Sequence, residues 1–324
     1  MYKILITGAS GYIGKCLFYY LKKKFNVVGI DKIRTSENKI FYLNLLNIKK
    51  LNQFIKKEKP DIIIHLAAQS LVDNTIDKKK YYDNNIKVTN NLLKVMKDNN
   101  IKKIIFSSTA AVYHQSSKLL TEKSKLKPLS TYSKTKLLCE NNIKKQKKIN
   151  SIILRLFNVC SAINKPLLGV SHNPVTHLIP TIVYKSIYNM KVYIYGNNFS
   201  TPDGTCIRDY IHIKDVCDAI EKSIIYLVKN NYSQIFNIGN KRGISNKEIL
   251  NYIKKFINSK INIQYVNKRA GDVSKLVCSY NKIKNILNWR PKNSSLSKII
   301  NDEIKWISKM KKKQISRNFK NYLN

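Results

Sequence analysis

The chain has 324 residues, of which 43% are hydrophobic, and carries a formal net charge of +41. This length and apolar content indicate a folded protein with one large or two modest domains, and they exclude a disordered chain. No apolar run reaches the roughly 18 residues of a membrane span, so we expect no membrane partner. The opening MYKILITG leads into a glycine-rich turn rather than a targeting signal.

Six cysteines are scattered through the sequence without the spacing of a metal site or of a redox motif: Cys16, Cys139, Cys160, Cys206, Cys217 and Cys278. This pattern fits a reducing compartment and argues against a disulfide framework. We therefore expect a cytoplasmic protein with no bound metal.

The positive charge comes almost entirely from lysine, because only seven of the 60 basic residues are arginine. Lys, Asn and Ile are in excess together, as in the product of an A+T-rich coding sequence. The lysines are spread over nearly every predicted helix rather than gathered on one. This favours a solvated surface over a nucleic-acid partner, while the charge should still attract anionic substrates.

Apolar periodicity predicts an alternation of strands and helices in the first half of the chain, typical of a parallel sheet covered by helices. Strands are predicted at 3–8, 26–31, 39–45, 59–68, 102–108 and 150–158, and helices at 12–24, 76–98 and 132–148. Beyond about residue 160 the rhythm breaks into loops, and helices return near 214–229, 245–258, 281–287 and 296–309. We predict an α/β fold with a Rossmann-type, doubly wound parallel sheet.

A glycine-rich turn lies between the first strand and the first helix, with Gly8, Gly11 and Gly14 in a G-x-x-G-x-x-G spacing. Such a turn lets the backbone approach a pyrophosphate and directs helix N–H groups at the anion. Asp31 ends the second strand 17 residues after Gly14. A carboxylate there accepts hydrogen bonds from ribose hydroxyls and repels a 2′-phosphate, which favours NAD over NADP.

A hydroxyl-rich stretch, SSTAAVY (107–113), leaves the strand at 102–108, and Tyr132 and Lys136 follow in YSKTK. A free tyrosine is a poor base because its pKa is near 10. We expect Lys136, one helical turn away, and a bound NAD⁺ to favour the phenolate. A pKa depression of about three units corresponds to ~4 kcal/mol. Thr109 could then hold a substrate hydroxyl with its proton toward Tyr132.

The glycine spacing and the Tyr-x-x-x-Lys pair together resemble the short-chain dehydrogenase/reductase superfamily, in its longer, sugar-nucleotide-modifying branch. The chain is similar to the UDP-glucose 4-epimerase family of NAD-dependent epimerases and dehydratases, over nearly all its length to about residue 307. The resemblance lies in YYDNNIKVTNNLL (81–93), IIFSSTAAVY (104–113), LRLFN (154–158), THLIP (176–180), TPDGTCIRDYIHIKD (201–215), RAGD (269–272) and LNWRP (287–291).

The resemblance implies two domains. An NAD-binding domain spans 1–165, with a return segment at about 206–242. A smaller, mixed α/β domain over 166–324 mainly holds the UDP-sugar, and its Lys-rich tail, 309–324, is expected to be loosely held. The resemblance also implies a homodimer, formed through helices at about 76–98 and 131–148 of each subunit.

The implied reaction interconverts UDP-galactose and UDP-glucose. Tyr132 removes the proton of the sugar 4-hydroxyl while hydride leaves C4 for the nicotinamide. The 4-keto sugar turns over in the site, and hydride and proton return on the opposite face.

Matching the motifs assigns a role to particular residues of this chain. The residues implied to line the cofactor are Gly8, Gly11, Tyr12, Ile13, Gly14, Asp31, Asn44, Leu45, Leu66, Ala67, Ala68, Gln69, Ser70, Asn84, Ser107, Tyr132, Lys136 and Phe157. Those implied to hold the UDP-sugar are Thr109, Asn158, His177, Leu178, Tyr193, Tyr195, Arg208, Arg269, Asp272 and Leu276. The forked guanidinium of Arg208 or Arg269 suits phosphate oxygens better than an ammonium group does.

The sequence departs from the family at several positions. Asn44 stands where an Asp is usual beside the adenine, and Ser70 where some members have Lys. His114 and Ser161 replace glycines, so either would strain its turn if the backbone there needs a positive φ.

Three other functions compete with this reading. A nucleotide-sugar dehydratase has an Asp-Glu pair after the threonine, but Ala110 and Ala111 stand there and cannot move a proton. An epimerase of N-acetylated UDP-sugars would need room at Leu276, the gate position, which is of intermediate size. A non-catalytic NAD-binding or nucleic-acid-binding protein could share the fold, but the complete Thr109–Tyr132–Lys136 set argues against it.

Overall fold

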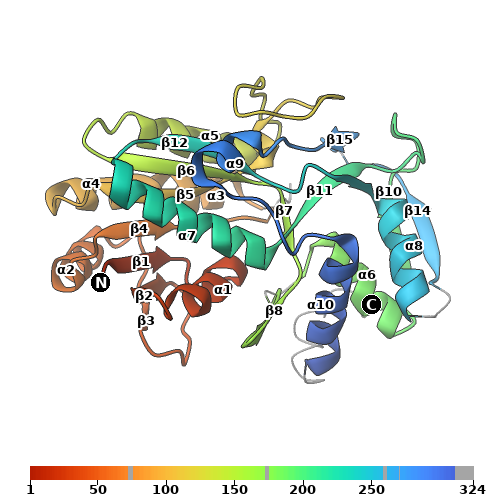
Figure 1. Cartoon of the computed structure of the whole chain (residues 1–324), viewed down its shortest axis with the longest axis horizontal. Helices are drawn as coiled ribbons and strands as arrows, with labels where there is room; N and C mark the ends of the chain where they lie inside the picture. Colours follow the sequence, from red (N-terminus) through yellow and green to blue (C-terminus); the bar gives the residue numbers. More distant parts are fainter. Residues whose placement is uncertain (72–75, 172–174, 258–260, 270, 311–324) are drawn as a thin grey trace.

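The computed structural model describes residues 1–71, 76–171, 175–257, 261–269 and 271–310. Its main sheet has seven strands, all parallel, in the order β12-β6-β5-β4-β1-β2-β3 (Figure 1). The strands are β1 Lys3–Thr7, β2 Asn26–Asp31, β3 Ile40–Tyr42, β4 Ile62–His65, β5 Lys103–Thr109, β6 Asn150–Leu156 and β12 Gln234–Ile238. The chain winds outward on both sides of β1, which confirms the predicted doubly wound α/β fold.

Both faces of this sheet are covered by helices, because successive side chains of a strand point to opposite faces. Ile4 and Ile6 of β1 pack in a core with α1 (Tyr12–Leu21), α7 (Ile213–Asn230) and α9 (Asn281–Leu287). Leu5 packs on the other face, in a core with α2 (Ile48–Glu58), α4 (Val88–Asp98) and α5 (Thr131–Lys144). The buried strands read as near-continuous aliphatic runs for this reason.

A second core lies beside the main sheet and contains α6 (Leu178–Ile187), α8 (Asn246–Ile257) and α10 (Leu296–Lys309) (Figure 1). Its short strands are β7 Asn158–Cys160, β8 Ile163–Asn164, β9 Leu167–Leu168, β10 Val192–Tyr195, β11 Ile207–His212, β13 Gly243–Ser245, β14 Ile263–Val266 and β15 Lys275–Leu276. Strand β11 pairs with β13, β15 and β7, whereas β10 pairs with β14 and β8 pairs with β9. The mixed pairing matches the predicted smaller α/β part.

Several predicted elements differ in their bounds. The helix predicted over 76–98 is divided into α3 (Lys78–Tyr81), a π-helical segment η1 (Tyr82–Lys87) and α4. The strand predicted at 59–68 is shorter, because α2 ends at Glu58 and Lys59 takes a left-handed φ of 46°. The strand predicted at 150–158 divides into β6 and β7.

Two helices escaped prediction, although α2 has a clear signal. Its apolar residues recur at helical spacing, and the side chain of Asn47 caps its N-terminus by accepting from the Lys50 amide. The other missed helix is α6. Most of the predicted tail, residues 311–324, lies outside the described residues.

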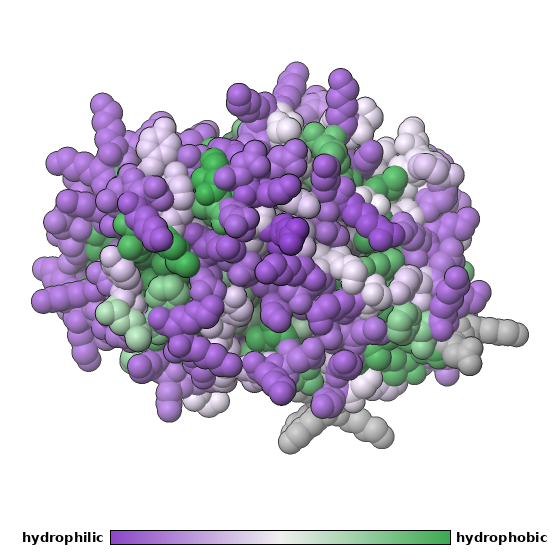
Figure 2. All heavy atoms as spheres, in the orientation of Figure 1, coloured by the Kyte–Doolittle hydropathy of each residue, from purple (hydrophilic) through white to green (hydrophobic). Residues whose placement is uncertain are grey.

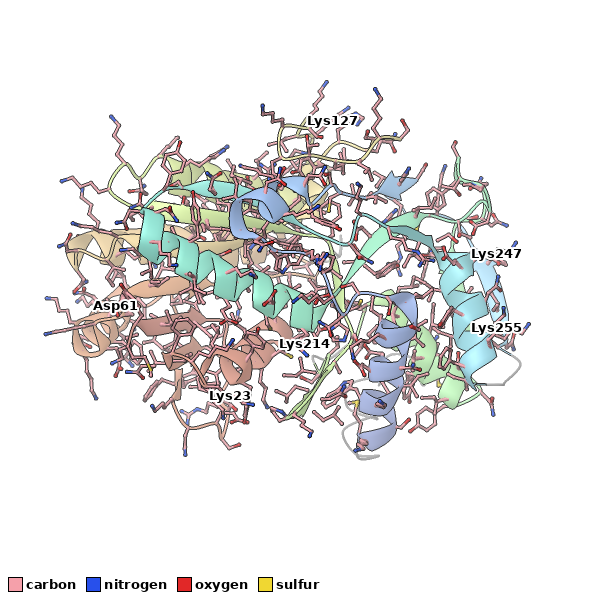
Figure 3. The ribbon with its side chains drawn as sticks, viewed as in Figure 1. Lys23, Asp61, Lys127, Lys214, Lys247 and Lys255 are labelled. Atoms are coloured by element: carbon pink, nitrogen blue, oxygen red, sulfur yellow. The ribbon has the colours of Figure 1, made fainter. Side chains whose placement is uncertain are left out.

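The face in Figure 2 is largely hydrophilic, with only small apolar areas. Figure 3 shows labelled lysines at widely separated places on this face, among them Lys23, Lys127 and Lys255. In this view the labelled lysines are therefore dispersed rather than gathered in one place. No helix among the described residues is long and apolar enough to cross a membrane.

Candidate active site

The glycine-rich turn joins β1 to α1 at the carboxyl edge of the sheet, where β1 lies between β2 and β4. Gly8 has a φ of 71°, and a Cβ added to it would lie 2.7 Å from the Ala67 nitrogen. A Cβ on Gly14 would lie 2.1 Å from the Gly8 carbonyl oxygen. Only glycine fits at these two positions, since the chain passes too close to itself for a side chain.

The start of α1 suits an anion. Gly11 is the N-cap of the helix and provides no side-chain cap, and the first turn contains no acidic residue. The amides of Tyr12 and Ile13 therefore begin a helix whose positive dipole end has no side chain to neutralise it. This observation fits the pyrophosphate of a dinucleotide.

Asp31 lies at the end of β2 beside this turn. One carboxylate oxygen accepts from the Ser10 amide at 2.9 Å and the other from the Ile33 amide at 3.0 Å. The two bonds orient the carboxylate, and each oxygen keeps a lone pair for a ribose hydroxyl. The neighbouring cations are already engaged, because Lys32 donates to Asn84 at 2.7 Å and the Arg34 guanidinium lies 4.8 Å from the centre of the Tyr42 ring.

The loop after β4 contains Leu66, Ala67, Ala68, Gln69 and Ser70. Asn85, which sequence reasoning passed over in favour of Asn84, holds this loop against α5. Its side chain accepts from the Gln69 amide at 2.7 Å and donates to the Gln69 carbonyl at 3.3 Å and to Thr135 at 2.8 Å. The π-helical segment that carries both asparagines is of a kind that is frequent at functional sites.

Asn44 is exposed, and its side chain accepts from the Leu46 amide at 3.0 Å, while Leu45 is buried. The amide oxygen of Asn44 is thus occupied within its own turn, as in an Asx-turn. Ser107, on β5, donates to the His65 carbonyl at 3.3 Å.

Thr109 ends β5, and Tyr132 and Lys136 lie one turn apart at the start of α5. The helix begins at Thr131 with a capping box between Ser130 and Ser133, which fixes the first turn that carries Tyr132. The Thr109 side chain is near enough to the Tyr132 phenol to lower its pKa, and its hydroxyl accepts from the Ala111 amide at 3.2 Å. Lys136 is only 2% exposed, and its ammonium lies 4.3 Å from the centre of the Phe106 ring. The structure therefore brings the three predicted catalytic residues to one edge of the sheet.

In the protein without cofactor, Tyr132 favours the neutral phenol rather than the expected phenolate. Burial raises the pKa of Tyr132 to about 12, and Thr109 opposes this only in part. Burial lowers the pKa of Lys136 to about 8, with Cys139 and Glu140 opposing. The expected depression of the Tyr132 pKa is for Lys136 and a bound NAD⁺ acting together, so it stays a prediction; in the protein alone, desolvation of the phenolate has the largest effect.

The predicted substrate residues come from several short elements of the second part. Asn158 begins β7, and His177 is the N-cap of α6, directly before Leu178. The His177 ring meets the edge of Tyr12, with ring centres 6.4 Å apart. Tyr193 and Tyr195 lie on the same face of β10, and both are exposed.

Arg208 and Leu276 lie opposite each other where β11 pairs with β15. Arg208 donates to the Val273 carbonyl at 2.7 Å and lies 3.8 Å from the carboxylate of Asp272. The Arg269 guanidinium lies 3.7 Å from the centre of the Tyr195 ring. The structure thus gathers Arg208, Asp272 and Leu276 in one place and pairs Arg269 with Tyr195.

The two glycine replacements differ in their effect. Ser161 has a φ of 74° and so holds a left-handed backbone, whereas His114 is not among the described residues with positive φ. The Ser161 hydroxyl donates to the Ile299 carbonyl at 3.0 Å, and its own carbonyl accepts from the Tyr12 hydroxyl at 2.6 Å. These contacts hold the strained residue in place.

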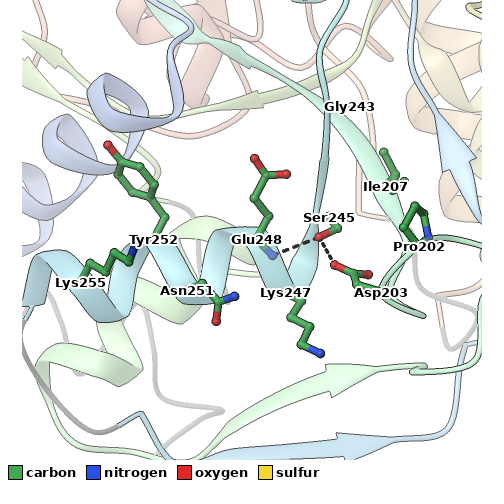
Figure 4. Close-up of a pocket in the computed structure, with 10 residues that line it drawn as sticks. All are labelled: Pro202, Asp203, Ile207, Gly243, Ser245, Lys247, Glu248, Asn251, Tyr252 and Lys255. Atoms are coloured by element: carbon green, nitrogen blue, oxygen red, sulfur yellow. Dashed lines mark hydrogen bonds between the residues drawn. The ribbon is translucent and has the colours of Figure 1, made fainter.

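A cavity of about 560 Å³ lies against α8 and β13, and its lining includes none of the predicted site residues (Figure 4). Its acidic side chains already have partners: Asp203 accepts from Ser245, and Glu248 pairs with Arg242. It assembles no set of reacting groups. Among the described residues, no group of three His, Cys, Asp or Glu side chains could hold a metal ion.

Comparison with known proteins agrees with this geometry. The sequence profile of the NAD dependent epimerase/dehydratase family matches residues 4–239. A UDP-glucose 4-epimerase of Lactobacillus helveticus is 36% identical over 318 residues, which cover 94% of this chain and 96% of that protein. One of Streptococcus mutans is 35% identical, with the same coverage of each.

A crystal structure of UDP-glucose 4-epimerase from Brucella ovis in complex with NAD has a TM-score of 0.89 and 28% identity, covering 95% of this chain and 98% of that one. The chain therefore belongs to the NAD dependent epimerase/dehydratase family, and its predicted resemblance to UDP-glucose 4-epimerases is confirmed.

Proposed function

We propose that this chain is a UDP-glucose 4-epimerase, which interconverts UDP-galactose and UDP-glucose. The observation that carries the proposal is the set Thr109, Tyr132 and Lys136 at the edge of the sheet beside the glycine-rich turn. The relatives named above point to the same reaction. Ala110 and Ala111 follow Thr109 and offer no acid or base to expel water, which disfavours dehydration.

The cofactor of this family is NAD, which when bound accepts a hydride from the sugar and later returns it. Gly8, Gly11 and Gly14 leave room for its pyrophosphate, and Asp31 would hold its adenosine ribose. The other predicted cofactor residues border this turn, follow β3, β4 or β6, or lie on η1, β5 and α5. These roles remain part of the proposal.

Tyr132 acts as the acid and base of the proposed mechanism. It accepts the proton of the sugar 4-hydroxyl as that carbon is oxidised, and it returns the proton after the 4-keto sugar has turned over in the site. Thr109, which lies beside the phenol, holds the 4-hydroxyl in line. Because burial keeps the phenol protonated in the protein alone, the positive charge of bound NAD⁺ must add to that of Lys136.

The UDP part is assigned to the second part of the chain. Arg208 and Arg269 would contact the diphosphate, where planar guanidinium groups match phosphate oxygens. The boundary near residue 165 between this part and the cofactor-binding part stays a prediction. We further infer a homodimer formed through the helices over 76–98 and 131–148, and a cytoplasmic location. The location is supported by six cysteines that are all free and buried.

Leu276 supports the smaller, non-acetylated sugars. It is buried in a cluster with Ala110, Tyr113, Phe157 and Cys278, so an N-acetyl group would have to displace packed side chains. A UDP-Glc/GlcNAc 4-epimerase from Campylobacter jejuni is also similar in structure, with a TM-score of 0.80 and 30% identity. UDP-N-acetylgalactosamine is therefore the competing substrate to assay.

The test is to incubate the purified protein with UDP-galactose, without added cofactor, and to assay for UDP-glucose. We expect product from the wild type and none from Tyr132→Phe. No product from the wild type, even with NAD added, would refute the proposed activity.

A further inference from the structure

A buried ion pair, Arg155–Glu140, joins β6 to α5, the helix that carries Tyr132 and Lys136. Arg155 is the residue before the end of β6 and only 2% exposed, and Glu140, on α5, is fully buried. Their contact is a two-pronged fork, because the Arg155 Nε–H donates to Glu140 Oε1 at 3.0 Å and Nη2 donates to Oε2 at 2.7 Å. Burying two charges costs desolvation energy that their attraction only balances, so such a pair by itself is weak evidence for stability.

The carboxylate of Glu140 joins the two elements that carry the proposed catalytic residues. It accepts from the hydroxyl of Ser108, the residue directly before Thr109 on β5. Glu140 also lies one helical turn after Lys136 on α5. Through this one side chain, the end of β5 is hydrogen-bonded to α5 at a position one turn beyond Lys136.

The other side of the Arg155 guanidinium faces Tyr113. Tyr113 packs with Phe157 and Leu276 in one cluster, which we call the Tyr113–Leu276 wall because it contains the gate position. Its Nη1 donates to the Tyr113 hydroxyl at 2.9 Å, and that hydroxyl donates to Asn237 at 2.7 Å. The Tyr113 ring packs in the same cluster as Leu276 and stacks on Phe157 at 6.5 Å between ring centres. Nη1 also donates to the Glu122 carbonyl at 3.3 Å. Arg155 therefore contacts Glu140, next to the catalytic elements, on one side, and Tyr113, in the wall that contains the gate position, on the other.

We propose that Arg155 is a positioning residue, which with Glu140 sets the placement of Thr109 relative to Tyr132 and Lys136 and of the Tyr113–Leu276 wall. This inference rests on the proposed function. A planar fork fixes two directions at once, which an ammonium group or an apolar side chain of similar size cannot do. A displacement of about 1 Å at reacting groups costs ~10²-fold in rate.

The test compares the wild type with Arg155→Lys, which keeps the charge without the fork, and with the double variant Glu140→Gln/Arg155→Met, which leaves no unpaired charge. We expect both to fold, kcat for UDP-galactose to fall ~10²-fold and KM to change less than ~3-fold. The rising limb of the kcat–pH profile should move to higher pH. In these variants Thr109 is displaced and lowers the pKa of Tyr132 less than it does in the wild type.

A matched control is Asp215→Asn on α7. Asp215 is also buried and accepts from Ser294 at 2.6 Å and from the Asn293 amide at 2.8 Å, away from the proposed catalytic residues. We expect it to lower stability and leave kcat and the pH profile unchanged. If Arg155→Lys and the double variant behave like this control, Arg155 is only structural and the proposal is refuted.

A second readout does not depend on epimerase activity. With ¹³C-labelled tyrosine, the NMR titration of Tyr132, assigned with Tyr132→Phe, should show a higher pKa in Arg155→Lys than in the wild type. The other titratable groups near Tyr132, which are Lys136, Cys139 and Tyr81, are unchanged in that variant. An inactive wild type would refute the proposed function, while an unshifted Tyr132 titration would still refute the role of Arg155.

Discussion

Glu303, on α10, gives a prediction about pH and stability. Its side chain is fully buried, and among the described residues neither carboxyl oxygen makes a hydrogen bond of good geometry, although the Ser161 amide lies near them. Burial raises the pKa of this carboxyl from 4.5 to about 8, and the Ser161 amide opposes this only in part. The folded protein therefore keeps a proton that the unfolded chain loses above pH 4.5.

The direction in which the unfolding free energy changes with pH follows from this difference in bound protons. Since the unfolded state binds fewer protons than the folded state between pH 4.5 and 8, the free energy of unfolding falls as pH rises through this window. At 1.36 kcal/mol per pKa unit, the loss attributable to Glu303 is ~3 kcal/mol at pH 7 and ~5 kcal/mol above pH 8. The loss is absent below pH 4.5.

The neighbouring groups do not titrate in the same window. Burial raises the pKa of Tyr12 well above its ordinary value, raises that of Cys16 to about 12, and raises that of Cys160 well above its ordinary value. All three are neutral from pH 4.5 to 8, so they do not add to the difference in stability between the wild type and a Glu303 variant in this range.

The assay is urea unfolding of the wild type and of Glu303→Gln, which has the shape of the protonated acid and cannot ionise. Their difference in unfolding free energy, measured from pH 5 to pH 9, cancels the other ionisable groups. We expect Glu303→Gln to become progressively more stable than the wild type as pH rises. A difference that stays constant across this range would refute the reasoning.

Three other predictions concern the proposed site and its support. Tyr132→Phe should lower kcat by ~10²–10⁴-fold, because the acid and base is lost, and its far-UV circular dichroism should match the wild type. Gly14→Ala should abolish the retention of NAD, since the added Cβ would lie 2.1 Å from the Gly8 carbonyl oxygen. The absorbance of the purified protein measures its NAD content, and a full NAD content would contradict the packing argument. Arg155→Met alone should lose ~3–5 kcal/mol of unfolding free energy by leaving Glu140 charged and unpaired, whereas Glu140→Gln/Arg155→Met should recover most of it. Equal losses in the single and double variants, measured by urea unfolding, would show that the pair is not responsible.

The sequence alone determined the features that depend on local patterns. Aliphatic runs separated by helical periodicity predicted six of the strands that the main sheet contains, and the glycine spacing predicted the turn after β1. The Tyr132–Lys136 spacing placed both side chains on one face of a helix, because residues four apart are neighbours there. The bounds of α9 and α10 agreed with prediction because a single apolar face defines each of them.

Only the tertiary structure decided which residues meet across long separations. Arg155 stands in an apolar strand, and its pairing with Glu140 follows from how α5 packs on β5 and β6. The positive φ at Ser161 depends on the tight path between β7 and β8. The raised pKa of Tyr132 likewise follows from burial, which spacing cannot reveal, because desolvation depends on every chain segment that surrounds the phenol.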